Sequence, residues 1–347
     1  MPSTQPPTWK NGIAVQTAEQ ILQSSPRNVA AKLVRAASLA NLGEAKKARQ
    51  ELKEVLTLQK DSNEARYQLA SLDLGEKRWA EAEAGFRMLA QSGDGRGITG
   101  LADCKIAQGQ PAAAVKLLEQ ELAQHPDRDA YRLALSEVQL QMGKFQEARA
   151  QLEQLVRRNP GFTDAVIRLG TVESKLGDKA AALENFHKAH QMQPSNTTAA
   201  LGYAMLLEEA GQTEQARTAY EDLLKVDREN PTALNNLAYL KAEQGVDLDQ
   251  ALGYAQRALQ RSPTDPNISD TLGLIYIRKK LTSQAVQVLR DLVARVPDNP
   301  SFHLHLGMAL YDAGEKQLAK KELEKALQHK PSAAEQTKIK ELAARIG

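Results

Sequence analysis

The chain has 347 residues, of which 42% are hydrophobic and 25% are charged, as in ordinary folded domains. Its 45 basic and 43 acidic side chains nearly cancel, which excludes a strong electrostatic attraction to nucleic acids or anionic lipids. The single cysteine excludes an intrachain disulfide and a cysteine-rich zinc site, and aromatic residues at 4% argue against base-stacking platforms.

Residues 1–28 are predicted to form a tail and half of a repeat. The segment MPSTQPPTWK is rich in proline and lacks the basic and apolar regions of a signal peptide. Ala14, Ala18 and Ile21 then keep a helical spacing before Pro26, which predicts one helix without an antiparallel partner. We therefore expect a cut or unsealed N-terminus. If complete, the chain is expected in the cytoplasm; if truncated, in the periplasm or cell envelope.

Residues 29–333 repeat with a period of about 34. Prolines hold this spacing, and alanines hold it twelve residues before each proline position. A fixed period of this length indicates a solenoid. The spaced prolines are Pro126, Pro160 and Pro194, then Pro263, Pro297 and Pro331. The alanines are Ala114, Ala148, Ala182, Ala216, Ala251, Ala285 and Ala319.

Each repeat is predicted to contain two helices. Between Pro160 and Pro194, apolar residues recur at three- and four-residue steps on both sides of a break at residues 176–178. Gly170 and Ala182 are small, so we expect the two helices to cross there. We expect glycine in the turn of most repeats, with Lys280 replacing one of them. The predicted turn glycines are Gly43, Gly75, Gly109, Gly143, Gly177, Gly211, Gly245 and Gly314.

The stretch SGDGRGITG at residues 92–100 matches the G-x-G-x-x-G pattern of dinucleotide-binding loops through Gly95, Gly97 and Gly100. That motif requires a preceding strand, and the repeat predicts helices on both sides. We therefore expect a tight turn in a shortened repeat junction, in which glycine accepts a positive φ.

These spacings closely resemble the tetratricopeptide repeat (TPR). The signature residues are a small residue at position eight, alanine at twenty, an aromatic residue or leucine at twenty-four and proline at thirty-two. The last repeats supply Gly273, Ala285, Leu289 and Pro297, then Gly307, Ala319, Leu323 and Pro331. The resemblance implies an all-α, right-handed superhelical solenoid of antiparallel helix pairs. Nine repeats are predicted from Val29, Asn63, Gly95, Asp129, Thr163, Thr197, Pro231, Pro266 and Pro300.

In this family the first helix of each repeat lines a concave groove, through positions two, five, nine, twelve and thirteen. The resemblance therefore implies a noncatalytic scaffold that binds another protein or peptide, and no cofactor is expected. The near-neutral charge and the lack of a long apolar run predict no nucleic-acid partner and no membrane insertion. The oligomeric state stays open. Asn235 and Asn236 resemble asparagines that grip peptide backbones in some such grooves. The predicted groove residues are Met205, Glu209, Asn235, Tyr239, Asp270, Leu274, Arg278, Met308, Tyr311 and Asp312.

Residues 334–347 are predicted to form a capping helix, with Ile339, Leu342 and Ile346 on one stripe. The last repeats also resemble bacterial TPR lipoproteins associated with exosortase and exopolysaccharide loci. This second resemblance supports an alternative function: a repeat arm or accessory subunit of an envelope, exopolysaccharide or transferase machine.

Candidate catalytic and metal-binding residues do not form a recognisable site. His303 and His305 are two residues apart on a helix, so they face different directions and cannot share a metal. His187 and His190 lack a third ligand, and Cys104 has no histidine at catalytic spacing. The sequence therefore predicts a protein that is not an enzyme.

Overall fold

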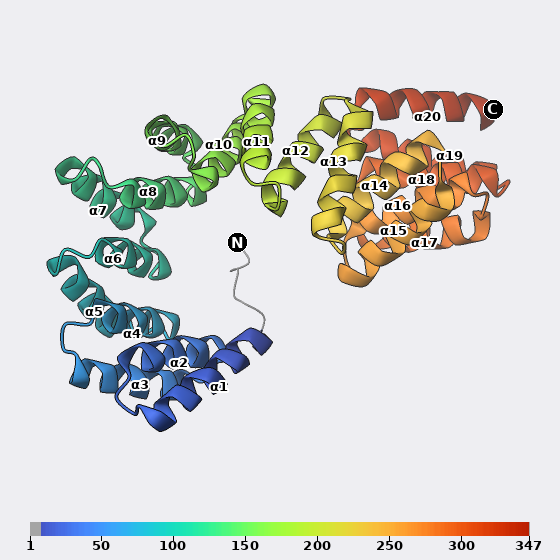
Figure 1. The fold of residues 1–347 in the computed structure, drawn as a ribbon. Coiled ribbons are helices and arrows are strands. Elements are labelled where there is room, and N and C mark those ends of the chain that lie inside the picture. The colour runs from blue at the N-terminus through green and yellow to red at the C-terminus, as the bar shows by residue number, and fades with distance from the viewer. Residues whose placement is uncertain (1–7, 347) are drawn as a thin grey trace. The chain divides into compact units, whose positions relative to one another are not determined.

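The computed structural model describes residues 8–346, which form 20 α-helices and no strand (Figure 1). The all-α solenoid of paired helices predicted from the repeat is confirmed in this part of the chain. Contacts divide the chain into two units, Met1–Asp178 and Lys179–Gly347.

In the first unit, each helix packs against the one that follows it along the chain. First and second helices of the repeats alternate from α2 onward, so α2 pairs with α3 and α8 with α9. The helices are α1 (Thr8–Ser24), α2 (Val29–Asn41), α3 (Ala45–Leu58), α4 (Asn63–Gly75), α5 (Trp79–Gln91), α6 (Arg96–Ala107), α7 (Pro111–Gln124), α8 (Asp129–Gln141), α9 (Phe145–Arg158) and α10 (Thr163–Leu176).

The second unit continues the same alternation. Successive first helices also contact one another in both units, for example α4 with α6 in the first and α14 with α16 and α16 with α18 in the second. The last helix, α20, packs on α18 and α19. The helices are α11 (Lys179–Met192), α12 (Thr197–Glu209), α13 (Thr213–Val226), α14 (Pro231–Gln244), α15 (Leu248–Arg261), α16 (Pro266–Arg278), α17 (Thr282–Arg295), α18 (Pro300–Asp312), α19 (Lys316–Gln328) and α20 (Ala333–Ile346).

Several first helices begin at a side chain that caps the exposed backbone N–H groups. Asn230 accepts from the N–H of Ala233 at 3.0 Å, and Asn299 accepts from Ser301 at 2.9 Å. Such a cap is worth about 1 kcal/mol. Proline at the first helical position, as in α14, α16 and α18, adds a preset φ without losing a hydrogen bond.

The turn between the two helices of a repeat places one residue in the left-handed region. Glycine fills it at most predicted positions, for example Gly43 with φ of 81°. The prediction for Gly75 was wrong, because Gly75 is the last residue of α4 and Lys77 takes the left-handed position with φ of 60°. Lys280 does the same with φ of 59°. Two turns therefore hold a lysine in a conformation that favours glycine.

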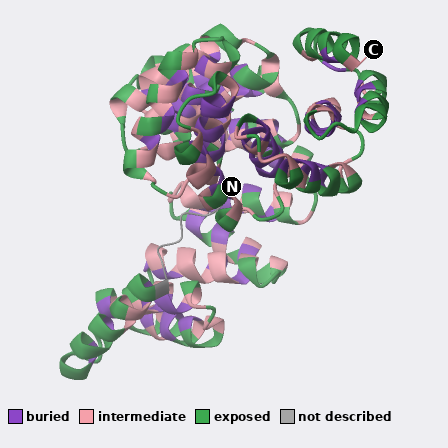
Figure 2. Cartoon of the chain, turned by 90° about the vertical axis from the view of Figure 1, so that its right-hand side faces the viewer, coloured by how far each residue is buried: buried purple, intermediate pink, exposed green. Residues whose placement is uncertain are grey.

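The core lies between the packed helices, and the outward faces are exposed (Figure 2). Small residues on first helices permit this close packing. A Cβ built on Gly273 would lie 2.4 Å from Leu289 of α17, and one on Gly307 would lie 2.8 Å from Leu323 of α19. The side chain at position twenty-four therefore fits directly against the glycine of the paired helix.

The glycines of residues 92–100 form a helix junction, as predicted, but by a different mechanism. Of these, Gly93 has a positive φ of 81°, whereas Gly95 has φ of −57° and precedes α6. Gly97 lies inside α6, where a Cβ would sit 2.2 Å from the backbone nitrogen of Ala90. Gly100 faces Phe86 at the same calculated distance of 2.2 Å. Two glycines therefore serve close helix packing rather than turn formation.

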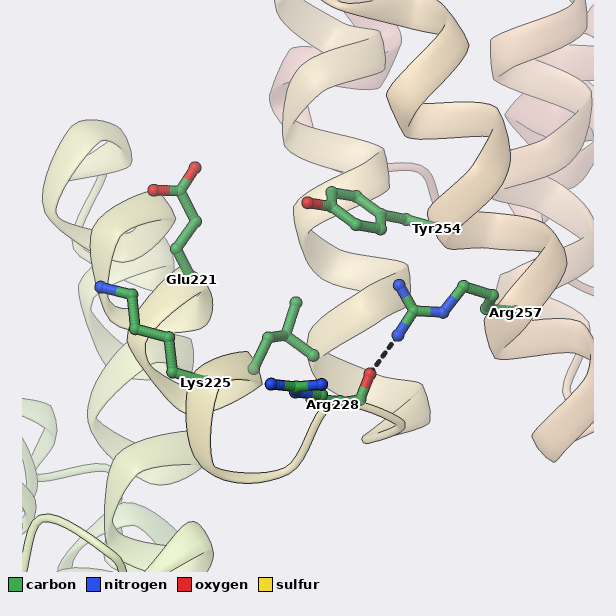
Figure 3. Close-up of a pocket in the computed structure, with 6 residues that line it drawn as sticks. Glu221, Lys225, Arg228, Tyr254 and Arg257 are labelled. Carbon is green, nitrogen blue, oxygen red and sulfur yellow. Dashed lines mark hydrogen bonds between the residues drawn. The ribbon is translucent and has the colours of Figure 1, made fainter.

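The junction between α13 and α14 has Arg228 where most repeats have proline, and Arg257 of α15 binds this junction (Figure 3). The Arg257 guanidinium donates to the carbonyl oxygen of Arg228 and to Glu229 at 2.8 Å. It also lies 6.0 Å from the Tyr254 ring. These contacts border a hollow of about 350 Å³ between α13 and α15. Arg257, one of the three basic residues that line it, is therefore already engaged in the junction.

The terminal helices differ from the repeats. The helix predicted from the spacing of Ala14, Ala18 and Ile21 begins at Thr8, while the proline-rich residues 1–7 lie outside the described part. Trp9 and Ile13 of α1 are 61% and 54% exposed. At the other end, Ile339 and Leu342 of α20 are buried, and Ile346 packs against the same cluster.

Candidate functional site

The first helices of the second unit and α20 surround a polar cavity of about 290 Å³. We call the surface formed by α14, α16 and α18 the first-helix face, and this hollow the α20 cavity. The repeat brings equivalent positions of successive first helices side by side, while α20 contributes one wall. The cavity is lined by Asn235, Asn236, Tyr239, Asn267, Asp270, Thr271, Asn299, Ser301, Phe302, Leu304, His305, Glu335 and Lys338.

A chain of hydrogen bonds leads from the core to the cavity. The buried Tyr220 hydroxyl donates to Glu208 at 2.7 Å and accepts from Asn236 Nδ2 at 2.9 Å. Asn236 Oδ1 in turn accepts from Asn235 Nδ2 at 3.3 Å. Asn235 is only 9% exposed, and its Oδ1 has no hydrogen-bond partner among the described residues. This series of hydrogen bonds therefore leaves the Oδ1 of Asn235, a residue that lines the cavity, as a buried acceptor without a donor.

Two pairs of oppositely charged side chains include residues that line the cavity. His305 Nδ1 lies 2.8 Å from Asp270 Oδ1, with both side chains buried. Burial alone would lower the pKa of His305, but the Asp270 carboxylate outweighs it and raises that pKa. Lys338 of α20 forms an ion pair with Glu243 of α14 at 3.0 Å. Both cations therefore already have a carboxylate partner.

Glu335 of α20 is the further carboxylate of the cavity. It accepts from the hydroxyl of Ser301 on α18 and from the backbone N–H of Ser332 at 2.7 Å.

Burial raises the pKa of Tyr239 to about 12, with Glu243 and Asp270 adding to the effect. The phenol therefore stays protonated beside several negative charges.

Three of the ten predicted groove residues line this cavity: Asn235, Tyr239 and Asp270. Leu274 does not belong to an accessible groove, because it is fully buried in the core between α14 and α16. Met308 and Tyr311 are partly buried against the cluster that contains Ile339 of α20. Helix α20 thus packs on residues predicted to contact a partner.

The remaining predicted residues lie elsewhere on the surface. Arg278 donates to the carbonyl of Ala242 at 3.0 Å, and Asp312 pairs with Lys280 at 3.1 Å. Met205 is 40% exposed, and Glu209 pairs with Lys179 at 2.9 Å. These four residues do not line the α20 cavity.

Position six of the repeat supplies Asn236, Thr271 and His305 to the cavity from three successive repeats. The sequence pointed to Asn236 together with Asn235, but Thr271 and His305 at the same position were missed. Glu335 and Lys338 were also missed, because they lie in α20 outside the repeat pattern.

The other candidate side chains have structural surroundings. His303 contacts Glu322 and the Pro297 carbonyl at 2.6 and 2.7 Å, well apart from the partner of His305. His187 stacks on Tyr203 with ring centroids 4.7 Å apart. Cys104 is fully buried, and burial raises its thiol pKa to about 11. Within residues 8–346, no cluster of three or more His, Cys, Asp or Glu residues is arranged to hold a metal ion.

No helix of the described residues is long and apolar enough to cross a membrane. The α20 cavity is lined by hydrogen-bond acceptors and by charged side chains from four helices. The cavity lies on the face formed by α14, α16 and α18.

Curated relatives match this chain over part of their own length. The peroxisomal targeting signal receptor of Candida albicans is 22% identical over 59% of this chain, which spans 36% of the receptor. Cellulose synthase operon protein C of Pseudomonas fluorescens is 28% identical over 52% of this chain, which spans only 15% of that protein.

Solved structures share the fold. A tetratricopeptide repeat protein from Parabacteroides merdae has a TM-score of 0.53 at 16% identity and covers 72% of this chain and 97% of its own. The Cut9–Hcn1 structure of the APC/C has a TM-score of 0.51 at 16% identity and covers 91% of this chain and 70% of its own. The sequence profile described as tetratricopeptide repeat matches residues 99–170, 174–238, 239–303 and 300–332. The chain therefore belongs to the tetratricopeptide-repeat family.

Proposed function

We propose that the chain is a noncatalytic scaffold that binds another protein or peptide through the first-helix face of its C-terminal unit. The observation that carries this proposal is the α20 cavity, in which Asn235 presents a buried acceptor without a partner. An unsatisfied buried acceptor costs about 1–3 kcal/mol, which a bound donor would recover. Tyr239 beside it supplies an aromatic anchor with a polar tip.

A matched pair of tyrosines tests this proposal. The partner is first captured from the native host on the immobilised protein and identified by mass spectrometry. Its Kd is then measured with Tyr239→Ala on the first helix and Tyr254→Ala on the second helix of the same repeat. We expect Tyr239→Ala to weaken binding by about tenfold or more and Tyr254→Ala to leave it unchanged. Equal binding by both variants would exclude the first-helix face as the recognition surface.

A second candidate function is a repeat arm or accessory subunit of an envelope-polysaccharide or transferase machine. Cellulose synthase operon protein C from two bacteria, at 27% and 28% identity, favours this reading. A human protein O-mannosyl-transferase, 24% identical over 54% of this chain, points the same way. The same capture experiment separates the two candidates, because an accessory subunit copurifies with a synthase or transferase.

A further inference from the structure

Position four of the repeat, counted from the start of each first helix, holds a basic side chain in four repeats. These residues are Lys32, Arg66, Arg132 and His303. In three of them the structure pairs the basic side chain with a carboxylate. Arg132 of α8 is the exception, because it forms no ion pair with any described residue. The fourth repeat therefore differs from the others in how this charge is compensated.

In the first repeat, two carboxylates neutralise the basic residue at position four. The Lys32 amine on α2 lies 2.7 Å from Glu54 and 3.5 Å from Glu51, both of which are on α3. These glutamates occupy positions 26 and 23 of the repeat. The first repeat thus shows where a carboxylate lies in this fold when it binds the cation at position four.

In the fourth repeat, positions 23 and 26 are both glutamine. Arg132 Nη1 donates to Gln151 Oε1 at 3.0 Å and to Gln154 Oε1 at 2.6 Å. Its Nη2 donates to the carbonyl oxygen of Pro126 at 3.0 Å. The fourth repeat therefore keeps the cation and replaces both carboxylates with neutral amides.

The surroundings of Arg132 disfavour its charge. The residue is only 9% exposed, and its Nε has no hydrogen-bond partner among the described residues. Arg158 of α9 donates to the same Pro126 carbonyl at 2.9 Å, which brings a second guanidinium close to the first. Burial lowers the pKa of Arg132, and the charge of Arg158 lowers it further. Because a buried charge without an opposite charge is costly, an anion at this place would be stabilising.

The charged residues around Arg132 leave a positive excess. Arg158 has one acidic partner, Asp129, at 3.2 Å, so two guanidinium groups share a single carboxylate. The segments that carry these groups, residues 127–132 and 149–158, contain five arginines and three acidic residues. The local charge therefore favours an anionic ligand.

The exposed side chain of Gln154 gives a ligand access to the buried guanidinium. Its printed position on α9 is at the surface, and Arg132 is its one hydrogen-bond partner among the described residues. When this amide turns into solvent, Arg132 Nη1 becomes open to an incoming group. A carboxylate there would take the place that Glu54 takes beside Lys32, with Arg158 next to it.

We propose that Arg132 and Arg158 form a binding site for a carboxylate group, an aspartate or glutamate side chain presented by a partner protein. Hydrogen bonds between a guanidinium and a carboxylate are about twice as strong as those between neutral groups, so the carboxylate displaces the Gln154 amide. Position four is not a groove position of the first helices. The site therefore goes beyond the first-helix face, and its test does not involve the α20 cavity.

The test uses small probes and the full chain. N-acetyl-L-glutamate N-methylamide is titrated into ¹⁵N-labelled protein at low ionic strength while backbone amide shifts are followed by NMR. The neutral isostere N-acetyl-L-glutamine N-methylamide is the matched control. We expect the glutamate probe to shift amides at the start of α8 and the end of α9, and to bind at least about tenfold more tightly than the glutamine probe.

Two variants change the site from within. Gln154→Glu supplies the carboxylate that the first repeat has at this position, so it should weaken the glutamate probe at least about tenfold and raise the midpoint of thermal unfolding. Because the variant is expected to be more stable than the parent, its loss of binding cannot come from misfolding. Arg158→Gln should weaken the probe about fivefold. Gln256→Glu, at an exposed position of α15, is the control for the change in net charge and should leave binding unchanged.

Four results would overturn the carboxylate assignment. They are the absence of saturable shifts with the glutamate probe, equal binding of the two probes, unchanged binding in Gln154→Glu, and tighter binding of inorganic phosphate than of the glutamate probe. The last result would assign the site to a phosphoryl group instead.

Discussion

Tyr220 donates its phenolic hydrogen to Glu208 across 2.7 Å while its oxygen accepts from Asn236 at 2.9 Å. The ring of Tyr220 is fully buried at the packing position of α13, where the family pattern asks only for a large side chain. The residue therefore has two roles: it fills the core and it orients the amides that reach the α20 cavity. Burial raises the pKa of this phenol, so it remains a donor at all physiological pH values.

Tyr220→Phe separates these roles, because it keeps the ring and removes the hydroxyl. Glu208 and Asn236 then lose a buried partner, and we expect the free energy of unfolding to fall by about 1–3 kcal/mol. Urea unfolding followed by circular dichroism measures it. Tyr254→Phe, on the neighbouring second helix α15, is the control and should change stability by less than about 0.5 kcal/mol. If Tyr220→Phe left the free energy of unfolding unchanged, the two hydrogen bonds of this hydroxyl would contribute nothing to stability.

Gly97→Ala tests the close packing in the junction at residues 92–100. The added methyl group would meet the Ala90 backbone at 2.2 Å, so we expect a loss of about 1–3 kcal/mol or more. Gly253→Ala is the control, since a Cβ there meets nothing within 4 Å in the helix α15. That change should raise stability by up to about 1 kcal/mol, and thermal unfolding compares the two.

The variant Gly97→Ala also tests whether the glycines of residues 92–100 bind a nucleotide. Gly97→Ala should leave the response to ATP and NAD unchanged from the parent, because the glycines lie between two helices. Saturable binding that disappears in Gly97→Ala would contradict the structural assignment of this motif.

Lys77→Gly and Lys280→Gly should stabilise the chain. Each lysine occupies the left-handed region, with φ of 60° and 59°, where an L side chain costs about 1–2 kcal/mol. Glycine relieves that strain but adds freedom to the unfolded chain, so we expect a net gain of about 0.5–1 kcal/mol each. Differential scanning calorimetry measures the change. The reverse substitution Gly109→Lys, at φ of 74°, should lower stability by a similar amount.

Cys104 should make stability depend on pH in the alkaline range. Its folded-state pKa is raised from 9.0 to about 11 by burial, so the folded chain keeps a proton that the unfolded chain has lost. The free energy of unfolding should therefore decline as pH rises from about 9 through about 11. The difference between the parent and Cys104→Ala isolates this term. A pH-independent difference would mean that the thiol is not buried.

The repeat period predicted the helices and the packing glycines well, because both depend on contacts between neighbouring repeats. Gly273 against Leu289 is such a contact: a small residue and a large one at fixed positions. The turn at Lys77 was harder to predict. The repeat spacing indicates roughly where a left-handed residue is needed, but lysine is not a residue type typical of that conformation. The turn was therefore assigned to Gly75, two residues away.

The candidate site was predictable only in part. The family pattern pointed to Asn235, Tyr239 and Asp270 because all three occupy groove positions of first helices, five or nine residues into a repeat. It placed Leu274 with them, although one helical turn further along that side chain is enclosed by α14. The position of α20 depends on a few contacts made by residues outside the repeat pattern. Glu335 and Lys338, which make such contacts, could therefore not be predicted from the repeat period.

The ion pair between Lys338 and Glu243 joins residues 95 positions apart, whereas the bond from Arg278 to Ala242 spans 36, about one repeat. Repeat proteins are usually shortened, extended or recombined unit by unit, because each unit touches only its neighbours. Here α20 also reaches back to α14, so α14 through α20 are expected to be exchangeable only as one block. Deleting the repeat formed by α18 and α19, or grafting another array before α20, would remove a wall of the cavity.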